Sequence, residues 1–235
     1  MNTSFADIEK KENRKALIIS ICVFLSGFSC FAQLYYFQPL LPDLAKDFIL
    51  SASESSFAIS FSTLGMVFGL FTTMFVADRI PRKKMIGTGL LSSSIFSVAA
   101  SFSPTFLPLI LLSAAKGFLL SGATSVSMAY IAEEVSSRNK GKIMGLYIAG
   151  NALGGMAGRV ISSWIGALYT WRIASVSIGL ICALFAILFL LFSPRSTNFM
   201  PRKESFHTLI IANLQLITSK ALIPFYLTGG LILGV

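Results

Sequence analysis

Residues 16–42 read ALIISICVFLSGFSCFAQLYYFQPLLP, an apolar stretch bounded by Lys15 and Asp43 with no charged residue inside it. A helix needs about 20 apolar residues to cross the hydrocarbon core of a bilayer, so this stretch is long enough to span it. It is too long for the hydrophobic region of a signal peptide, and no small-residue cleavage site follows it. The stretch therefore predicts a first membrane-spanning helix that stays in the protein.

Five further apolar stretches follow along the chain. The whole sequence is 54% hydrophobic and only 12% charged, which is far more apolar than a soluble domain. The turn SFSPTFLP at 101–108 divides the long stretch after Lys84 into two helices, and no alternating pattern typical of a β-barrel occurs. We therefore predict an all-α integral membrane fold with six transmembrane helices, the later five within 54–78, 84–100, 109–131, 143–168 and 172–195.

Basic residues gather in the loops on one side of the predicted membrane. They precede the first helix and follow the second, fourth and sixth helices, whereas the loops on the other side carry few of them. Short basic loops are retained in the cytoplasm, so we expect a cytoplasmic N-terminus and a multi-pass protein of the cell membrane, most simply a bacterial inner membrane. The net charge of +9 comes from these dispersed clusters, so nucleic acid is not an expected partner.

The chain divides into four segments. Residues 1–15 form a polar cytoplasmic tail, 16–194 the six-helix domain, and 195–220 a cytoplasmic linker. The last run, ALIPFYLTGGLILGV at 221–235, is too short to cross a bilayer by itself. We interpret it as the truncated start of a seventh helix.

No catalytic or metal-binding pattern is present in the sequence. All three cysteines, Cys22, Cys30 and Cys182, lie in apolar stretches, where they are expected to act as small packing residues. His207 is the only histidine and falls in the predicted linker. No nucleophile and base have a suitable spacing, so we expect neither an enzyme nor a cofactor or metal site.

The loop after the second helix reads VADRIPRKKMIG at 76–87. Judged by charge alone, it could be a simple positive anchor on the cytoplasmic side. It also resembles the loop 2-3 signature of the major facilitator superfamily, G-x-x-x-D-R-x-G-R-R, although Met74 and Pro81 replace the two glycines. The resemblance implies a cytoplasmic gate against the second half of the molecule, formed by Asp78, Arg79, Arg82 and Lys83.

The fifth predicted helix contains GLYIAGNALGGMAGRVISSWIG at 145–166. Glycines at every fourth position, Gly150, Gly154 and Gly158, leave a stripe without side chains against which another helix can pack closely. The stretch resembles the helix-five motif of drug-proton antiporters, G-x-x-x-G-P-x-x-G-G. Arg159 either faces a polar interior or a partner, together with Asn151 on the same helix face, or snorkels to the membrane interface.

Three further polar residues are candidates for a substrate or proton pathway. Gln33 and Tyr36 belong to a polar face of the first helix, and Lys116 lies in the fourth helix, three residues after the position of the family's arginine. The resemblance implies that these residues line the central cavity. Hydrogen bonding between helices remains open for Gln33 and Tyr36, and snorkelling for Lys116.

The resemblance covers residues 16–235 and is closest to the bacterial proton-coupled exporters of drugs and sugars. It implies six helices arranged as a 3+3 inverted repeat, the N-terminal half of the family's fold, in a secondary active transporter. The implied activity is proton-coupled efflux by alternating access, with the lipid bilayer, a small-molecule substrate and protons as partners. A C-terminal half or a second copy would complete it. The alternative is a six-helix membrane protein that does not transport, either a remnant or a half that pairs with another chain.

Overall fold

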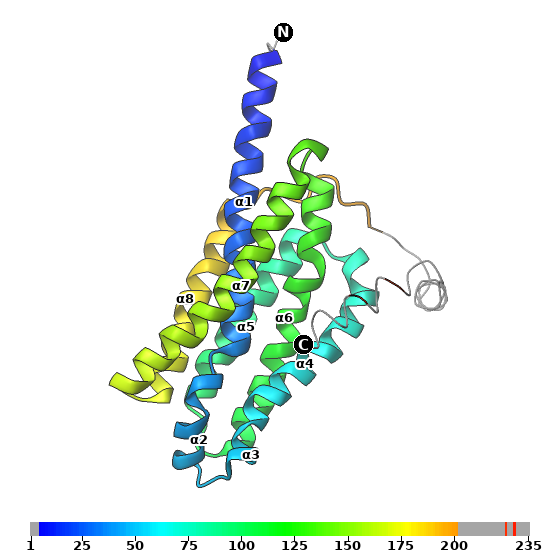
Figure 1. Cartoon of the computed structure of the whole chain (residues 1–235). Coiled ribbons are helices and arrows are strands. Elements are labelled where there is room, and N and C mark those ends of the chain that lie inside the picture. Colours follow the sequence, from blue (N-terminus) through cyan, green and yellow to red (C-terminus); the bar gives the residue numbers. More distant parts are fainter. Residues whose placement is uncertain (1–4, 202–223, 225–227, 229–235) are drawn as a thin grey trace. The chain divides into compact units, whose positions relative to one another are not determined.

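The computed structural model describes residues 5–201 together with Pro224 and Thr228, and the rest of the predicted linker and seventh helix lies outside these residues. Met1–Met200 belong to one compact unit, and no β-strand occurs in the described part of it. Six long helices build this unit (Figure 1): α1 Phe5–Tyr35, α4 Phe57–Val76, α5 Arg82–Ser101, α6 Phe106–Glu134, α7 Ser137–Leu168 and α8 Trp171–Phe192.

The six predicted helices are confirmed, one in each apolar stretch. Within residues 5–201, four segments are long and apolar enough to cross a membrane by length and composition, namely those that contain α1, α4, α6 and α8. In α5, serines and three basic residues at its start lower the mean hydropathy, and in α7 glycines, Asn151 and Arg159 do the same. These two helices are therefore recognised by their place between the others and not by their composition.

Several helices extend further than predicted. α7 begins at Ser137, six residues before the expected Ile143, and α6 begins at Phe106 and ends at Glu134. Polar residues at a helix end can continue the backbone hydrogen bonding outside the apolar stretch, so hydropathy alone places these ends too far inward. α1 begins at Phe5 within the charged tail and projects past the other helices (Figure 1).

The connection from α1 to α4 is built from three short helices: η1 Gln38–Leu40, α2 Leu41–Asp47 and α3 Ala52–Ser55. Prolines occupy the first turns of η1 and α2, where no backbone N–H is needed. Ser51 caps α3, since its side chain accepts from the Glu54 backbone N–H while the Glu54 carboxylate accepts from the Ser51 N–H.

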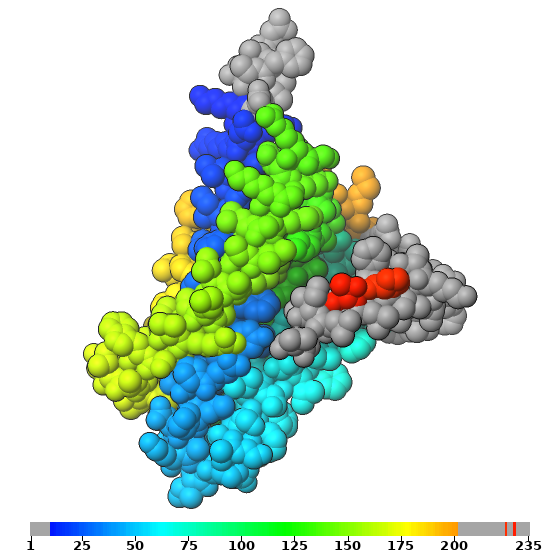
Figure 2. Space-filling view, in the orientation of Figure 1, coloured from blue at the N-terminus to red at the C-terminus, as the bar shows by residue number. Residues whose placement is uncertain are grey.

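Close helix pairs determine how the bundle is packed. α1 packs chiefly against α7 and α8, α6 packs against α4 and α5, and the contact between α1 and α6 is smaller. A Cβ atom added to any of the three stripe glycines of α7 would lie within 3.0 Å of α1 backbone atoms. In Figure 2, α7 runs across the near face of the bundle, with parts of α1 visible beside it. The facing residues on α1 are Phe24, Phe28 and Ala32.

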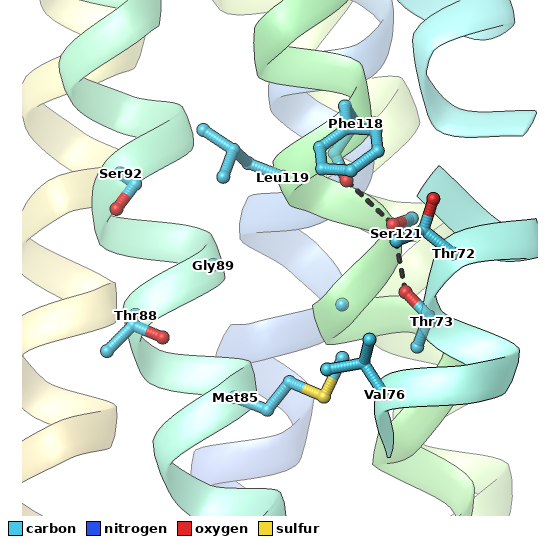
Figure 3. A pocket seen from close by; sticks show the side chains of 11 residues that line it. Thr72, Thr73, Val76, Met85, Thr88, Gly89, Ser92, Phe118, Leu119 and Ser121 are labelled. Carbon is cyan, nitrogen blue, oxygen red and sulfur yellow. Dashed lines mark hydrogen bonds between the residues drawn. The ribbon is translucent and has the colours of Figure 1, made fainter. Parts of the chain in front are cut away.

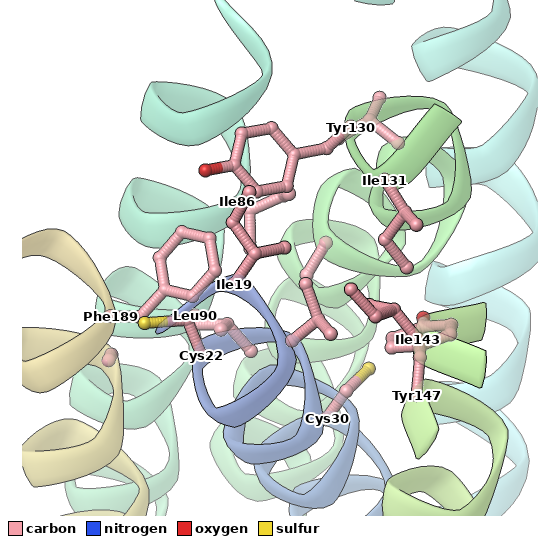
Figure 4. Close-up of a cluster of buried hydrophobic side chains, with 14 of the residues drawn as sticks. Ile19, Cys22, Cys30, Ile86, Leu90, Tyr130, Ile131, Ile143, Tyr147 and Phe189 are labelled. Atoms are coloured by element: carbon pink, nitrogen blue, oxygen red, sulfur yellow. The ribbon is translucent and has the colours of Figure 1, made fainter. Parts of the chain in front are cut away.

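An apolar cluster fills the interior near the end where α1 begins. Five helices direct side chains into it (Figure 4), including Cys22 and Cys30 from α1. All three cysteines are buried and unpaired, which agrees with the packing role expected from the sequence. The remaining labelled members of the cluster are Ile19, Ile86, Leu90, Tyr130, Ile131, Ile143, Tyr147 and Phe189.

At the opposite end, Asp47 ties α2 to the start of α8. Its Oδ2 atom accepts from Trp171 Nε1 at 2.9 Å and from Arg172 at 3.0 Å. The same guanidinium donates to the carbonyl oxygens of Ser101 and Ser103 in the turn between α5 and α6. These contacts hold the short helices against the long ones at this end.

The second residue after α2, Ile49, adopts an unfavourable backbone conformation. Ile49 has φ 54° and is 93% exposed, while the next amide, of Leu50, donates to the Ala45 carbonyl oxygen at 2.8 Å. Glycine is the usual residue at this position of a helix end, because a Cβ atom is strained there. We expect Ile49→Gly to raise the free energy of unfolding by about 0.5 to 1 kcal/mol.

The free energy of unfolding in mixed detergent and dodecyl sulfate micelles measures this change. Ile49→Ala is the matched control, because it removes the branched side chain but keeps the strained Cβ atom. If Ile49→Ala and Ile49→Gly raised the free energy of unfolding equally, the exposed side chain of Ile49, and not its backbone conformation, would be the source of the destabilisation.

Candidate functional site

Arg82 is the centre of an ion-pair network at the end of the bundle where α1 begins, called here the basic end. Its NH2 atom lies 2.8 Å from Asp78 Oδ1 and 3.1 Å from Glu133 Oε1. Its Nε atom donates to Glu133 at 3.2 Å, and its NH1 atom donates to the Ala77 carbonyl oxygen at 2.6 Å. The guanidinium thus joins the start of α5 to the end of α6 and to η2 (Ala77–Arg79).

The predicted gate residues take different positions in this network. Asp78 and Arg82 pair with each other, Lys83 donates to the Ser193 carbonyl oxygen, and Arg79 is exposed. The residues expected from the sequence did not include Glu133, which shares Arg82 with Asp78. The available signal was an acidic pair, Glu133 and Glu134, on the same side of the membrane as a basic loop.

Glu134 holds the segment after α8 against the basic end. Its buried carboxylate pairs with Lys15 at 2.8 Å and accepts from the Thr197 hydroxyl and the Asn198 backbone N–H. Nearby, the Tyr130 hydroxyl lies 2.8 Å from Ser193 Oγ and donates to the Pro194 carbonyl oxygen at 2.8 Å. The beginning of the predicted linker is therefore fixed on the bundle by hydrogen bonds.

Three of the candidate pathway residues meet inside the bundle. Gln33 and Tyr36 are fully buried, and Lys116 is 1% exposed. Lys116 Nζ lies 4.5 Å from the centre of the Tyr36 ring and 4.9 Å from that of Phe37. Gln33 Oε1 accepts from Ser97 Oγ on α5 at 3.2 Å. The structure thus places these residues between α1, α5 and α6, and not on an open face of the described bundle.

Several polar atoms around this group have no hydrogen-bond partner among the described residues. They include Gln33 Nε2, the Tyr36 hydroxyl and Lys116 Nζ. A polar atom without a partner is costly in a membrane interior, where no bulk water can replace the missing bond. The group therefore offers donors to a ligand. The hydroxyls of Ser26, Ser29, Ser62 and Ser113 are likewise unpartnered.

Asn151 and Arg159 lie apart from this buried group. Asn151 is half-buried, and a Cβ atom added to Gly27 of α1 would collide with its Oδ1 atom. Arg159 is exposed, and its guanidinium carbon lies 4.6 Å from the centre of the Tyr35 ring. Arg159 therefore lies on the outer surface of the described bundle, where an aromatic face partly replaces lost hydration.

A cavity that the sequence analysis did not anticipate lies between α4, α5 and α6 (Figure 3). Its volume is about 200 Å³ and its walls are mostly apolar. The Thr73 and Ser121 hydroxyls lie 3.3 Å apart on one wall, and Ser121 donates to the Phe118 carbonyl oxygen at 2.6 Å. Two glycines from different helices, Gly89 of α5 and Gly122 of α6, line this cavity. A cavity formed between helices cannot be predicted from the residue spacing within one helix.

The model of the Major Facilitator Superfamily matches residues 19–235. An uncharacterized transporter of Buchnera aphidicola from Schizaphis graminum is 35% identical over 227 residues, covering 97% of this chain and 55% of that protein. The inner membrane transport protein YnfM of Escherichia coli is 35% identical over 202 residues, which cover 86% of this chain and 48% of YnfM. The chain thus spans about half the length of these relatives.

Two solved structures have the same helical arrangement. The human organic anion transporter MFSD10 superposes with a TM-score of 0.64 at 18% identity, over 83% of this chain and 52% of that one. The peptide transporter POT, in complex with sulfate, superposes with a TM-score of 0.67 at 13% identity, over 93% of this chain and 46% of that transporter. At these identities the likeness establishes the fold alone.

Proposed function

Because the chain belongs to the major facilitator superfamily, we propose that it is one half of a secondary active transporter that moves a small molecule by alternating access. The family and the names of the relatives indicate a membrane transporter and not an enzyme. The observation that carries the proposal is the buried group of Gln33, Tyr36 and Lys116. Such groups inside a membrane are expensive, and they are typical of substrate and ion pathways.

Helix pairing supports a 3+3 inverted repeat in which α1, α4 and α5 correspond to α6, α7 and α8. In this repeat α1 corresponds to α6, and α7 corresponds to α4. The packing of α1 against α7 should therefore be repeated by the packing of α6 against α4, and both pairs do make close, extensive contacts. Glycines make both possible, because a Cβ atom at Gly154 would meet the Phe28 backbone and one at Gly117 would meet the Ser62 backbone. The small contact between α1 and α6 then lies on the repeat axis.

The basic end is proposed to face the cytoplasm of a bacterium, with the protein in the inner membrane. The distribution of basic residues and the name of YnfM support this orientation and location. The network of Asp78, Arg82 and Glu133, beside Arg79 and Lys83, would then form the cytoplasmic gate. Proton-coupled efflux is the proposed mode, in line with the antiporter-like pattern of α7.

A transporter of this family requires a second six-helix half. A C-terminal half or a second copy of this chain is the proposed partner, since the relatives are about twice as long. The alternative is a six-helix membrane protein that does not transport by itself. Pairing and transport are separable properties, so each needs its own measurement.

Reconstitution into liposomes containing a pH-sensitive dye tests both properties. We expect compounds that are substrates to move protons across the membrane when the chain is present, and liposomes without protein serve as the control. Native mass spectrometry of the same sample reports whether the chain is a monomer or a dimer. A dimer that moves no protons with any compound of a broad panel would contradict the proposal in favour of the alternative.

A further inference from the structure

The charge of Lys116 has no counter-ion in the helices around it. All ten acidic residues of the chain lie at positions 7–12, 43–54, 78, 133–134 and 204, so none occurs within the membrane-crossing parts of the described helices. Lys116 Nζ has no hydrogen-bond partner among the described residues, although its side chain is 1% exposed. A buried ammonium group without a partner is strongly unfavourable.

Aromatic contacts offset only part of this cost. The Tyr36 and Phe37 rings lie beside the ammonium group, with their centres 4.2 Å apart. Cation–π contacts stabilise a desolvated cation far less than hydration or an ion pair does. The geometry therefore leaves one positive charge available to a ligand.

The neighbouring polar atoms are suited to an anion. Gln33 Oε1 already accepts from Ser97, so the Nε2 group of Gln33 remains as a free donor. Within the part of the chain that the structure describes, the Tyr36 hydroxyl has no hydrogen-bond partner, and neither does that of Ser113, one helical turn before Lys116 on the same side of α6. An ammonium group beside the Tyr36 ring, together with unpartnered N–H and O–H donors on the same helices, matches a carboxylate, which only accepts hydrogen bonds when ionised.

We infer that Lys116 binds the carboxylate of a small monocarboxylate substrate, with Gln33 and Tyr36 as additional donors. This inference rests on the proposed transport function and names the substrate class for the same site. One buried cation balances one negative charge, which favours a monocarboxylate over a dicarboxylate or a phosphate.

Thermal unfolding of the purified 235-residue chain, without any transport step, tests the inference. The probes are acetate, lactate and benzoate, with acetamide, lactamide and benzamide as uncharged counterparts and chloride as an inorganic anion. A ligand that binds only the folded state raises the unfolding temperature with its concentration. We expect at least one carboxylate to do so, and neither its amide nor chloride.

Substitutions then assign the effect to the site. Lys116→Met keeps the length of the side chain without its charge, and we expect it to weaken carboxylate binding about tenfold or more. Tyr36→Phe should weaken binding by a few fold, and it remains informative if the first variant does not fold. Lys46→Met, which removes an exposed lysine at the opposite end, should leave binding unchanged.

Three results would overturn the inference. They are equal carboxylate binding by the wild type and both site variants, stabilisation by chloride as strong as that by carboxylates, and no stabilisation by any carboxylate. Proton movement driven by uncharged compounds, combined with any of these results, would leave the transport function standing. Carboxylate binding at Lys116 by a dimer that moves no protons with any compound of the panel would instead reject transport and retain the site.

Discussion

Replacing Gly154 with alanine is expected to lower the free energy of unfolding by about 2 to 3 kcal/mol, although only one methyl group is added. The added Cβ atom would lie closer than 3.0 Å to backbone atoms of Phe28, and a backbone cannot rotate away as a flexible side chain can. α1 and α7 must then move apart along a contact that runs through most of the membrane. Close packing between membrane helices depends on this approach.

Gly145→Ala is the matched control on the same helix. A Cβ atom there meets nothing within 4 Å, so the substitution should be neutral or slightly stabilising, because alanine favours a helix more than glycine does. Circular dichroism during a titration with dodecyl sulfate measures both variants. Similar stabilities of the two alanine variants would refute the proposed role of Gly154 in packing.

Replacing Arg82 with alanine is expected to lower the free energy of unfolding by about 2 kcal/mol. The guanidinium is nearly buried, and its removal leaves Asp78 and Glu133 close together with no positive charge between them. Both carboxylates remain partly exposed to water, so the cost stays below the 3 to 5 kcal/mol that is typical of a fully buried pair. Arg82→Lys should recover only part of the loss, since lysine cannot reach Glu133 through two nitrogen atoms.

The same denaturation experiment, run at low and high salt, measures this effect. Lys84→Ala removes an exposed positive charge two residues away and should change stability by less than about 0.5 kcal/mol. Salt should narrow the difference in stability between Arg82→Ala and the wild type, because Asp78 and Glu133 are partly exposed and salt screens exposed charges. A loss of stability equal to that of Lys84→Ala would show that the network contributes nothing to folding.

The fold was predictable because crossing a bilayer imposes a length and a polarity on every helix. Residues 16–42 alone indicated the first helix, and the same rule located α4, α6 and α8, whereas α5 and α7 were placed by their position between these helices. Helix ends were less predictable, as the start of α7 at Ser137 shows. Hydropathy reports the apolar part of a helix, whereas backbone hydrogen bonds determine where the helix ends.

The candidate site was predictable only in part. Spacing along α1 indicated Gln33 and Tyr36 as members of one polar face, and the isolated charge of Lys116 was evident in the fourth helix. Their meeting with each other and with Ser97 depends on contacts between three helices. The role of Glu133 as a partner of Arg82 depends in the same way on residues that are distant in the sequence.

The sequence by itself determined the number of helices, the side of the membrane on which basic residues gather, and the glycine stripe of α7. These properties follow from residue type and local spacing, which the chain carries before it folds. Only the tertiary structure decided that Lys116 is buried against two aromatic rings and that Arg159 lies on the outer surface. Both residues are isolated charges in apolar helices, and the direction that each faces is set by the helices packed around it.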